Sequence, residues 1–483
     1  MMKGSVLLDD TSLAGENGGR SSSSMEMKAA SPGQSLRPKR GLARLGGTLP
    51  LFFLLGLLVC VPLGLQAQED ILPGKDVPLP SDGPMDFTRS VKVCLRQSPA
   101  LTGSSLEIDL RRLDESDARF AFIPSFSLRT LYYVNQPANE TDRPYSISFV
   151  TETYNPIENY FSLQARKVLT QMGILAHLQV ISDFLERLGM GFLELEALDG
   201  MMALQREIEG VAERNLAYTR TRLDSGGVSG LDVQLAEREL EAARLEAGKL
   251  ELAGATILEG LGGMMGFGGE HALMLNWENA REQVLGQFDP ERVSLDEARG
   301  NSFELRIQAL KRELQEKNIT LAYTRFLPTF VWGVQTTDPF SVTEERGLFF
   351  SVGLELPIWD GLKRYHNVSR QKTILRQVEA EGKSKELGFD GKWSAARRKL
   401  EQSTAGLRMA RSQESLAELK ERQTTIGYNA GRLPLSSLAA DRRALLESRK
   451  SVLSQALERD KAALAIRNLS GDLVRKYVDT SPY

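Results

Sequence analysis

The stretch Gly226–Leu240 reads GGVSGLDVQLAEREL, and the stretch Gly431–Leu445 reads GRLPLSSLAADRRAL. Both begin with glycine and continue with apolar residues at helical spacing among charged ones. The two stretches lie about 205 residues apart, which indicates an internal duplication. In each copy the glycine marks a turn that ends one helix and starts the next.

Three further pairs of short motifs recur in the same order at nearly the same spacing. Their offsets are about 204, 204 and 201 residues. The pairs are Ser98-Pro99-Ala100-Leu101 with Ser302-Phe303-Glu304-Leu305, 119–124 with 324–328, and Asn155-Pro156-Ile157 with Leu356-Pro357-Ile358. We therefore predict a first repeat over 86–259, a glycine-rich connector over 260–290, a second repeat over 291–472 and a tail over 473–483.

Each repeat is predicted to contain a short helix pair, two β segments, one very long helix and one shorter returning helix. The long helices, about 157–223 and 361–428, reach roughly 100 Å at 1.5 Å per residue. Ser294 and Glu297 have the spacing of a capping box at a helix start. The segment 260–269 is so rich in glycine that we expect little regular structure there. The other predicted helices cover 86–118, 228–258, 294–323 and 434–469.

The four β segments alternate apolar and polar residues, as a two-faced sheet requires. Their length and aromatic-bearing apolar face fit tilted membrane-spanning strands, although a small sheet packed on helices has the same pattern. Open strand edges are costly in lipid, so four strands need other chains to close a barrel, and three chains supply twelve. The expected lipid-facing residues are Phe126, Leu128, Tyr145, Phe149, Phe330, Trp332, Phe350 and Val352.

The N-terminus has the features of a secretory signal peptide. A disordered, Gly- and Ser-rich leader is followed by basic residues at 37–44 and an apolar run at 49–65. We predict cleavage after Ala67, and the alternative is an uncleaved membrane anchor. Cys60 is not expected to be lipidated, because Val59 precedes it. We thus assign 1–67 to leader and signal peptide and 68–85 to an extended linker.

Composition argues against several classes of protein. The charges of the 60 basic and 63 acidic residues nearly cancel. The chain therefore has no excess of positive charge to neutralise nucleic-acid phosphates, and a nucleic-acid partner is not indicated. The three histidines are isolated, and no phosphate-binding loop or nucleophile elbow is present, so we predict no enzyme, metal or cofactor. Narrow apolar stripes, such as Leu231, Leu235, Ala242 and Leu245, favour a helical bundle or α-barrel. A periplasmic coiled-coil adaptor or scaffold is the alternative.

Over about 86–471 the chain resembles the TolC-like outer-membrane efflux family. The resemblance rests on the two glycine-marked turns, the paired motifs and the segment 353–361, GLELPIWDG. It implies a homotrimer with a twelve-stranded β-barrel in the outer membrane and an α-helical barrel across the periplasm. It also implies passive conduction, in efflux or type I secretion, from a periplasmic adaptor and an inner-membrane pump of RND or ABC type.

The resemblance further implies roles for the two turns. Adaptor docking is expected at Gly226, Gly227, Val228, Gly431, Arg432 and Leu433. The periplasmic entrance is expected at Asp232 and Asp441. However, Ser437 and Ala440 occupy positions where familiar members carry carboxylates, and Asp441 is displaced by one residue, or about 100° around a helix. We therefore predict a weak acidic constriction.

Overall fold

The computed structural model describes residues 84–123, 126–132, 145–151, 154–267, 275–336, 348–356 and 358–478, all of which belong to one unit spanning 72–483. The predicted signal segment and its cleavage site at Ala67 lie outside the described residues. So do most of the expected linker and the loops between the paired strands.

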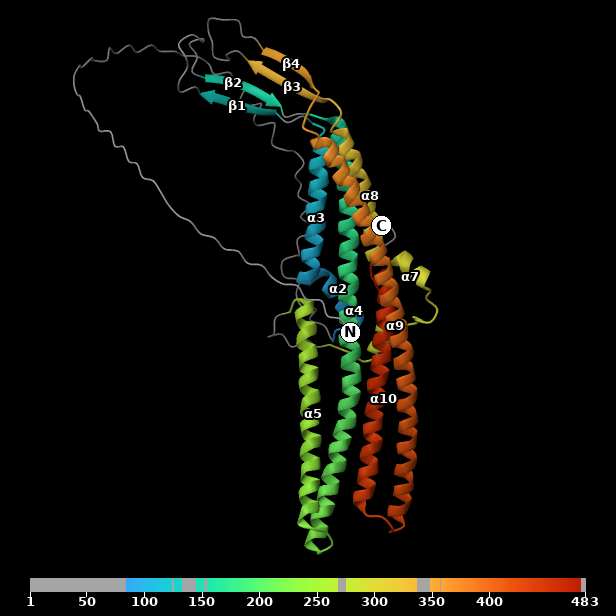
Figure 1. Cartoon of the computed structure of the whole chain (residues 1–483). Helices are drawn as coiled ribbons and strands as arrows, with labels where there is room; N and C mark the ends of the chain where they lie inside the picture. Colours follow the sequence, from blue (N-terminus) through green and yellow to red (C-terminus); the bar gives the residue numbers. More distant parts are fainter. Residues whose placement is uncertain are drawn as a thin grey trace, which may run out of the picture. The chain divides into compact units, whose positions relative to one another are not determined.

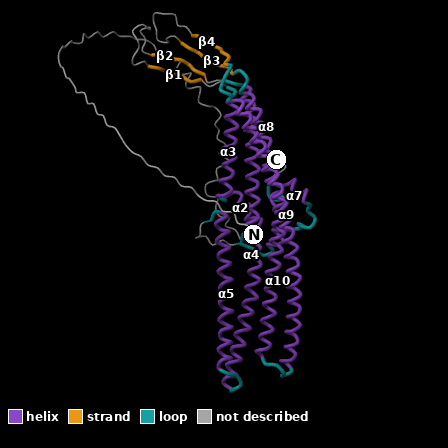
Figure 2. Tube along the Cα trace, in the orientation of Figure 1, coloured by secondary structure: helices purple, strands orange, loops and turns teal. Residues whose placement is uncertain are grey.

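The order of elements repeats, as the paired motifs predict (Figure 1). Helices dominate both copies, and the strands form one small group (Figure 2). The first copy contains α2 (Phe87–Gln97), α3 (Pro99–Phe120), β1 (Phe126–Tyr132), β2 (Tyr145–Thr151), α4 (Pro156–Asp224) and α5 (Gly230–Met265). The second contains α7 (Leu295–Asn301), α8 (Phe303–Thr324), β3 (Thr329–Thr336), β4 (Leu348–Glu355), α9 (Lys363–Asn429) and α10 (Leu435–Leu469). Two short helices, α6 (Ala280–Leu285) and α11 (Asp472–Arg475), follow the first and second copies.

The long helices α4 and α9 have 69 and 67 residues, close to their predicted bounds. Asn155 caps α4, because its Oδ1 accepts hydrogen bonds from the backbone N–H groups of Ile157 and Glu158, both at 3.1 Å. Pro156 follows at the first helical position, where its missing N–H costs nothing. At α7, Ser294 Oγ accepts from Glu297 N at 3.2 Å, which is the serine half of the predicted capping box.

Two boundary predictions were wrong. Helix α5 continues to Met265, through glycines expected to lack regular structure, and ends at Gly266 with φ +85°. Each helical glycine costs about 1 kcal/mol relative to alanine, but Leu261 and Met265 are buried in the core and offset this cost. The expected tail begins inside the packed structure, because Leu473 and Val474 are completely buried.

The four strands form one antiparallel sheet in the order β1-β2-β3-β4. Directly opposed residues of an antiparallel pair occupy the same face. The register pairs apolar or aromatic positions across every junction: Leu128 with Phe149, Tyr132 with Tyr145, Phe149 with Val334, Phe330 with Leu354, Trp332 with Val352, and Val334 with Phe350. All eight predicted lipid-facing positions therefore share one face of the sheet.

The main hydrophobic core surrounds the middle of α4. Phe87 of α2 meets Phe192 of α4 edge to face, with ring centroids 5.5 Å apart, and both rings are fully buried. Leu185 on α4 and Leu464 on α10 are also fully buried in this cluster. One 18-residue window of α4 is apolar enough to cross a membrane, with mean hydropathy 1.3, but 44% of it is buried inside the chain. Packing in the core accounts for such a composition.

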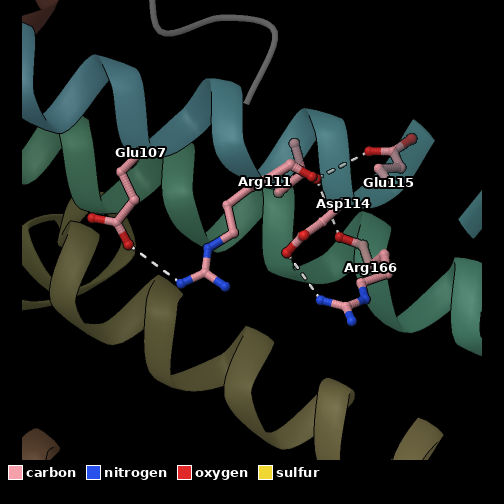
Figure 3. A network of polar contacts seen from close by, with 6 residues as sticks. Glu107, Arg111, Asp114, Glu115 and Arg166 are labelled. Atoms are coloured by element: carbon pink, nitrogen blue, oxygen red, sulfur yellow. Dashed lines mark hydrogen bonds and ion pairs between the residues drawn. The ribbon is translucent and has the colours of Figure 1, made fainter. Parts of the chain in front are cut away.

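Polar contacts tie α3 to α4 nearer the sheet (Figure 3). Arg166 of α4 reaches Asp114 of α3 at 3.0 Å, and Thr170 donates to the Glu115 carboxylate at 3.0 Å. Arg111 pairs with Glu107 one helical turn away, at 3.3 Å. The Arg166–Asp114 and Arg111–Glu107 ion pairs are solvent-accessible, so each contributes little to stability. Thr170 is buried, and its bond to Glu115 helps to set the register of α3 and α4.

A buried arginine joins the end of α10 to the segment between the repeats. Arg467 donates through Nη1 to the carbonyl oxygens of Val284 at 2.6 Å and Leu285 at 3.1 Å, and through Nε to Asp472 at 2.8 Å. Its guanidinium also lies over the Phe288 ring, 5.5 Å from the centroid. One planar, permanently charged fork thus satisfies two carbonyls near the end of α6 and one carboxylate.

We predict that Arg467→Lys lowers the free energy of unfolding by about 2 kcal/mol, because an ammonium cannot replace the fork and leaves buried carbonyls unpaired. Urea unfolding followed by circular dichroism measures this change. The control is Arg408→Lys on an exposed part of α9, which should leave the midpoint unchanged. Equal midpoints for both variants would show that Arg467 does not hold this junction.

Candidate functional site

The structure presents two surfaces that can serve transport, and the first is the sheet. Its apolar face carries all eight residues expected to contact lipid, and Val352 and Leu354 on that face are exposed. Within the described residues, β1 and β4 each pair on one side only, so both edges are open. A sheet of this kind can enter lipid only when another strand covers each edge.

The second surface is formed by the two hairpin tips, which have the same backbone design. At the first, Gly226 has φ +73°, Gly227 N donates to Arg222 O at 2.7 Å, and Gly226 N donates to Leu223 O at 2.9 Å. These two hydrogen bonds form a Schellman motif, which requires a residue in the left-handed conformation just past the helix. Glycine adopts that conformation without steric cost.

The second tip repeats the arrangement. Gly431 has φ +70°, Arg432 N donates to Gly427 O at 2.9 Å, and Gly431 N donates to Tyr428 O at 2.8 Å. Leu433 lies directly over Gly427: a Cβ placed on Gly427 would meet Leu433 Cδ1 at 2.6 Å. The tip is therefore a fixed turn, with Arg432 exposed and Leu433 about 40% exposed.

A groove of about 550 Å³ lies close to the tips, between the α4–α5 hairpin and α10. Small residues of α10, Ser436, Ala439 and Ala440, form one wall. Asn215 of α4 lines the groove as well, and its buried Oδ1 has no hydrogen-bond partner within the described part of the chain. Sequence reasoning missed this groove, because its walls come from helices more than 200 residues apart.

The structure gives Asp232 a local role that the sequence analysis overlooked. Its carboxylate accepts hydrogen bonds from Ser229 N and Ser229 Oγ, both at 2.8 Å, while Asp232 N donates to Ser229 Oγ. This is a complete capping box at the start of α5. The bonds from Ser229 lower the pKa of Asp232, so the cap is fully formed above the ordinary aspartate pKa and is lost as pH falls through the lowered value.

Asp441 is turned toward the neighbouring helix of its own hairpin. Its carboxylate accepts a hydrogen bond from the Thr424 hydroxyl of α9, and its side chain is half-buried. Arg443 pairs with Glu447 at 2.9 Å, while Arg442 is exposed and makes no ion pair within the described residues. The geometry does not bring Asp232 and Asp441 together as a carboxylate pair within one chain.

Ser104 and His177 form a serine–histidine contact, with Oγ and Nδ1 2.7 Å apart. The Ser104 hydroxyl also donates to Leu101 O at 2.9 Å, and the His177 tautomer decides whether Nδ1 donates to Oγ or accepts from it. Burial lowers the pKa of His177, which keeps the ring neutral between α3 and α4. The pair is therefore a packing contact between these helices.

Residues 91–266 match the family model described as outer membrane efflux protein. A membrane protein from Pseudomonas aeruginosa superposes with a TM-score of 0.67 at 15% identity, over 80% of this chain and 90% of that one. The chain is similar to the outer membrane efflux proteins. Its resemblance to this family, expected from the paired motifs, is confirmed.

Two further solved structures share the efflux-protein fold. The open state of the Neisseria gonorrhoeae MtrE outer membrane channel matches with a TM-score of 0.66 at 14% identity, over 80% of this chain and 88% of that one. The Campylobacter jejuni CmeC outer membrane channel matches with a TM-score of 0.66 at 13% identity, over 82% and 88% of the two chains. No characterised protein sequence matches this chain significantly.

We predict that Gly431→Ala destabilises the second tip by about 1 kcal/mol, because alanine is strained at positive φ. Hydrogen exchange at 427–433 measures the effect as faster exchange. The matched control is Gly248→Ala, at a helical site of α5 with open space around the new methyl group, which should slow local exchange. If the amides at 427–433 exchange at the same rate in Gly431→Ala as in Gly248→Ala, the Schellman assignment is contradicted.

We also predict that Asp441→Asn leaves ion selectivity unchanged in bilayer recordings, because the hydrogen bond from Thr424 holds the Asp441 carboxylate against α9. Reversal potentials across a planar bilayer in a salt gradient measure selectivity. Thr424→Val is the companion variant, because it frees the carboxylate and should raise cation preference. A marked loss of cation preference in Asp441→Asn alone would place this side chain in the conducting path.

Proposed function

We propose that this chain is the protomer of an outer-membrane channel that conducts substrates passively from a periplasmic adaptor and inner-membrane pump to the exterior. The single observation that carries the proposal is the four-stranded sheet, with one apolar face and two open edges. The family match and the shared fold support the channel over a periplasmic adaptor or scaffold. The sheet lies in the outer membrane in this account, and the long helices extend into the periplasm.

Trimer formation covers both the open strand edges and the exposed apolar rows on the helices. Three sheets joined edge to edge, β4 of one chain to β1 of the next, give a closed barrel of twelve strands. The helices likewise lack a partner, since α3, α5 and α9 carry rows of apolar side chains with exposed fractions of 44% to 74%. These rows are Leu106, Leu110, Leu113 and Phe120 on α3; Leu231, Leu235, Leu245 and Leu252 on α5; and Leu387, Met409, Leu416, Leu419 and Ile426 on α9.

The spacing within these rows is that of helix-to-helix seams. Leu231, Leu245 and Leu252 lie at multiples of seven residues, as do Met409 with Leu416 and Leu419 with Ile426. Such seams need a partner helix from another copy, which arranges the helices side by side in a barrel. A wide helical barrel continuous with a strand barrel provides a water-filled path without moving parts of its own.

The hairpin tips and the neighbouring groove are the proposed docking surface for a periplasmic adaptor. The tips are rigid turns with exposed Arg432 and partly exposed Leu433. The groove has a wall of small residues that permits close approach of a helix, and the unpaired Asn215 Oδ1 offers one acceptor to a donor on the partner. An RND- or ABC-type pump is expected behind the adaptor, and the cargo follows from the pump.

Nothing in the described residues favours an enzyme. No group of three His, Cys, Asp or Glu side chains is placed to hold a metal within the described ranges. Cys94 on α2 is fully buried, and burial raises the pKa of its thiol to about 12. The channel needs neither a cofactor nor a nucleophile.

The proposal predicts a trimer in the outer-membrane fraction, with Leu245→Asp/Leu252→Asp shifting it to monomers because two charges enter an apolar seam. Density-gradient separation of the membranes and native mass of the detergent-solubilised protein test both statements. The control is Arg238→Asp/Lys249→Asp on the same helix, where the wild-type residues are already charged and exposed. A monomer in the inner-membrane or soluble fraction would favour the adaptor alternative.

A further inference from the structure

The first turns of α9 carry several exposed basic side chains. Lys363, His366 and Arg370 follow one another at i, i+3 and i+7, so they lie along one face of the helix, and all three are exposed. Lys363 and Arg370 make no ion pair within the described residues. Arg364 points elsewhere and pairs with Asp360, at 3.4 Å.

The charged residues of this segment are all basic. Between Asp360 and Glu379 the sequence holds five lysines and arginines and no acidic residue. Two of these, Lys372 and Arg376, lie toward α8: Lys372 Nζ is 5.6 Å from the Tyr323 ring centroid, and Arg376 lines the groove shared with α8. Lys363 and Arg370 therefore remain as exposed cations without an ion pair in the described part of the chain.

The first repeat has this feature only in part. Its long helix α4 begins with Glu158 in the first turn, and Glu158 pairs with Arg325 at 3.5 Å. Arg166, on the next turns of α4, is engaged by Asp114 (Figure 3). Lys167 beside it is exposed and makes no ion pair within the described residues. The first turns of α4 therefore mix paired charges of both signs with one exposed cation, while the first turns of α9 present two.

Exposed apolar side chains lie between the sheet and these cations. Ile358 and Trp359 are 91% and 79% exposed, and Tyr365 on the first turn of α9 is exposed too. Along the chain the order is apolar strand, aromatic residues, then cations. A bilayer presents the same order of chemistry from its hydrocarbon core through the interface to the phosphates.

We propose that Lys363, His366 and Arg370, together with Ile358 and Trp359, form a binding surface for anionic phospholipids, here called the α9 collar. In this assignment Ile358 and Trp359 insert at the boundary of the helix-side leaflet, and Lys363 and Arg370 bind lipid phosphates. The inference rests on the proposed function only in placing the sheet in the outer membrane. Lipid is chosen over free phosphate because the two most exposed apolar side chains adjoin the cations.

The test uses the full-length, detergent-solubilised protein and native mass spectrometry with phosphatidylglycerol or phosphatidylcholine added. We expect the wild type to retain phosphatidylglycerol preferentially, and Lys363→Gln/Arg370→Gln to lose roughly tenfold or more in affinity, since each basic residue near a headgroup contributes about 1 kcal/mol. Arg408→Gln/Arg411→Gln is the matched control on the same helix, where both arginines are exposed and make no ion pair within the described residues. Circular dichroism and native mass verify that each variant folds and assembles.

Three results would overturn the α9 collar. Equal lipid retention by the wild type and the collar variant is one, and displacement of the lipid by millimolar inorganic phosphate is another. The third comes from Trp359→Phe in vesicles of phosphatidylcholine with brominated acyl chains and 20% phosphatidylglycerol, a composition of about one anionic lipid in five. There the collar predicts that the substitution removes part of the tryptophan quenching, and unchanged quenching contradicts it.

These outcomes separate the collar from the channel. A trimer in the outer membrane that binds both lipids equally would support the proposed function and contradict the α9 collar. Absence of the protein from the outer membrane would contradict both the proposed function and the α9 collar.

Discussion

Helices of 69 and 67 residues carry more apolar surface than one chain of this size can cover, and this constraint governs the rest of the structure. The core buries only the middle of α4 with its neighbours, around Phe192 and Leu464. Toward the tips, rows such as Leu245 and Leu252 remain open. The sheet has the same deficit at β1 and β4. In the proposed trimer, the association of identical chains around one axis covers both the helical rows and the strand edges.

Within the chain, a few contacts keep the two repeats in register. Arg467 connects the last turn of α10 with α6, and so joins the end of the second repeat to the segment that follows the first. Far from it, each hairpin ends in a Schellman motif that depends on one glycine. The middle is thus fixed by burial and a charged fork, while the tips are fixed by local backbone geometry. A partner can bind such tips without ordering them first, which lowers the entropic cost of docking.

The surfaces beside the sheet and at the tips differ between the repeats, although the order of elements is the same. In the first repeat, Asp232 completes a capping box and Arg166 is engaged by Asp114. In the second, Asp441 bonds to Thr424, while Lys363 and Arg370 are exposed and make no ion pair among the described residues. Duplication preserved the helices and strands, and the charged side chains then diverged on surfaces that the backbone does not need. The functional asymmetry of the protomer lies in these side chains.

The sequence by itself determined the order of elements, the bounds of α4 and α9 and the apolar face of the sheet. Each depends on periodicity, glycine position or capping within a few residues, which are local properties. Only the tertiary structure decided that α5 continues to Met265, because burial of Leu261 and Met265 outweighs the glycines. It likewise decided the partners of Asp441 and Arg467 and the groove beside Asn215. Those depend on which helices meet across more than a hundred residues, and no local pattern encodes such distances.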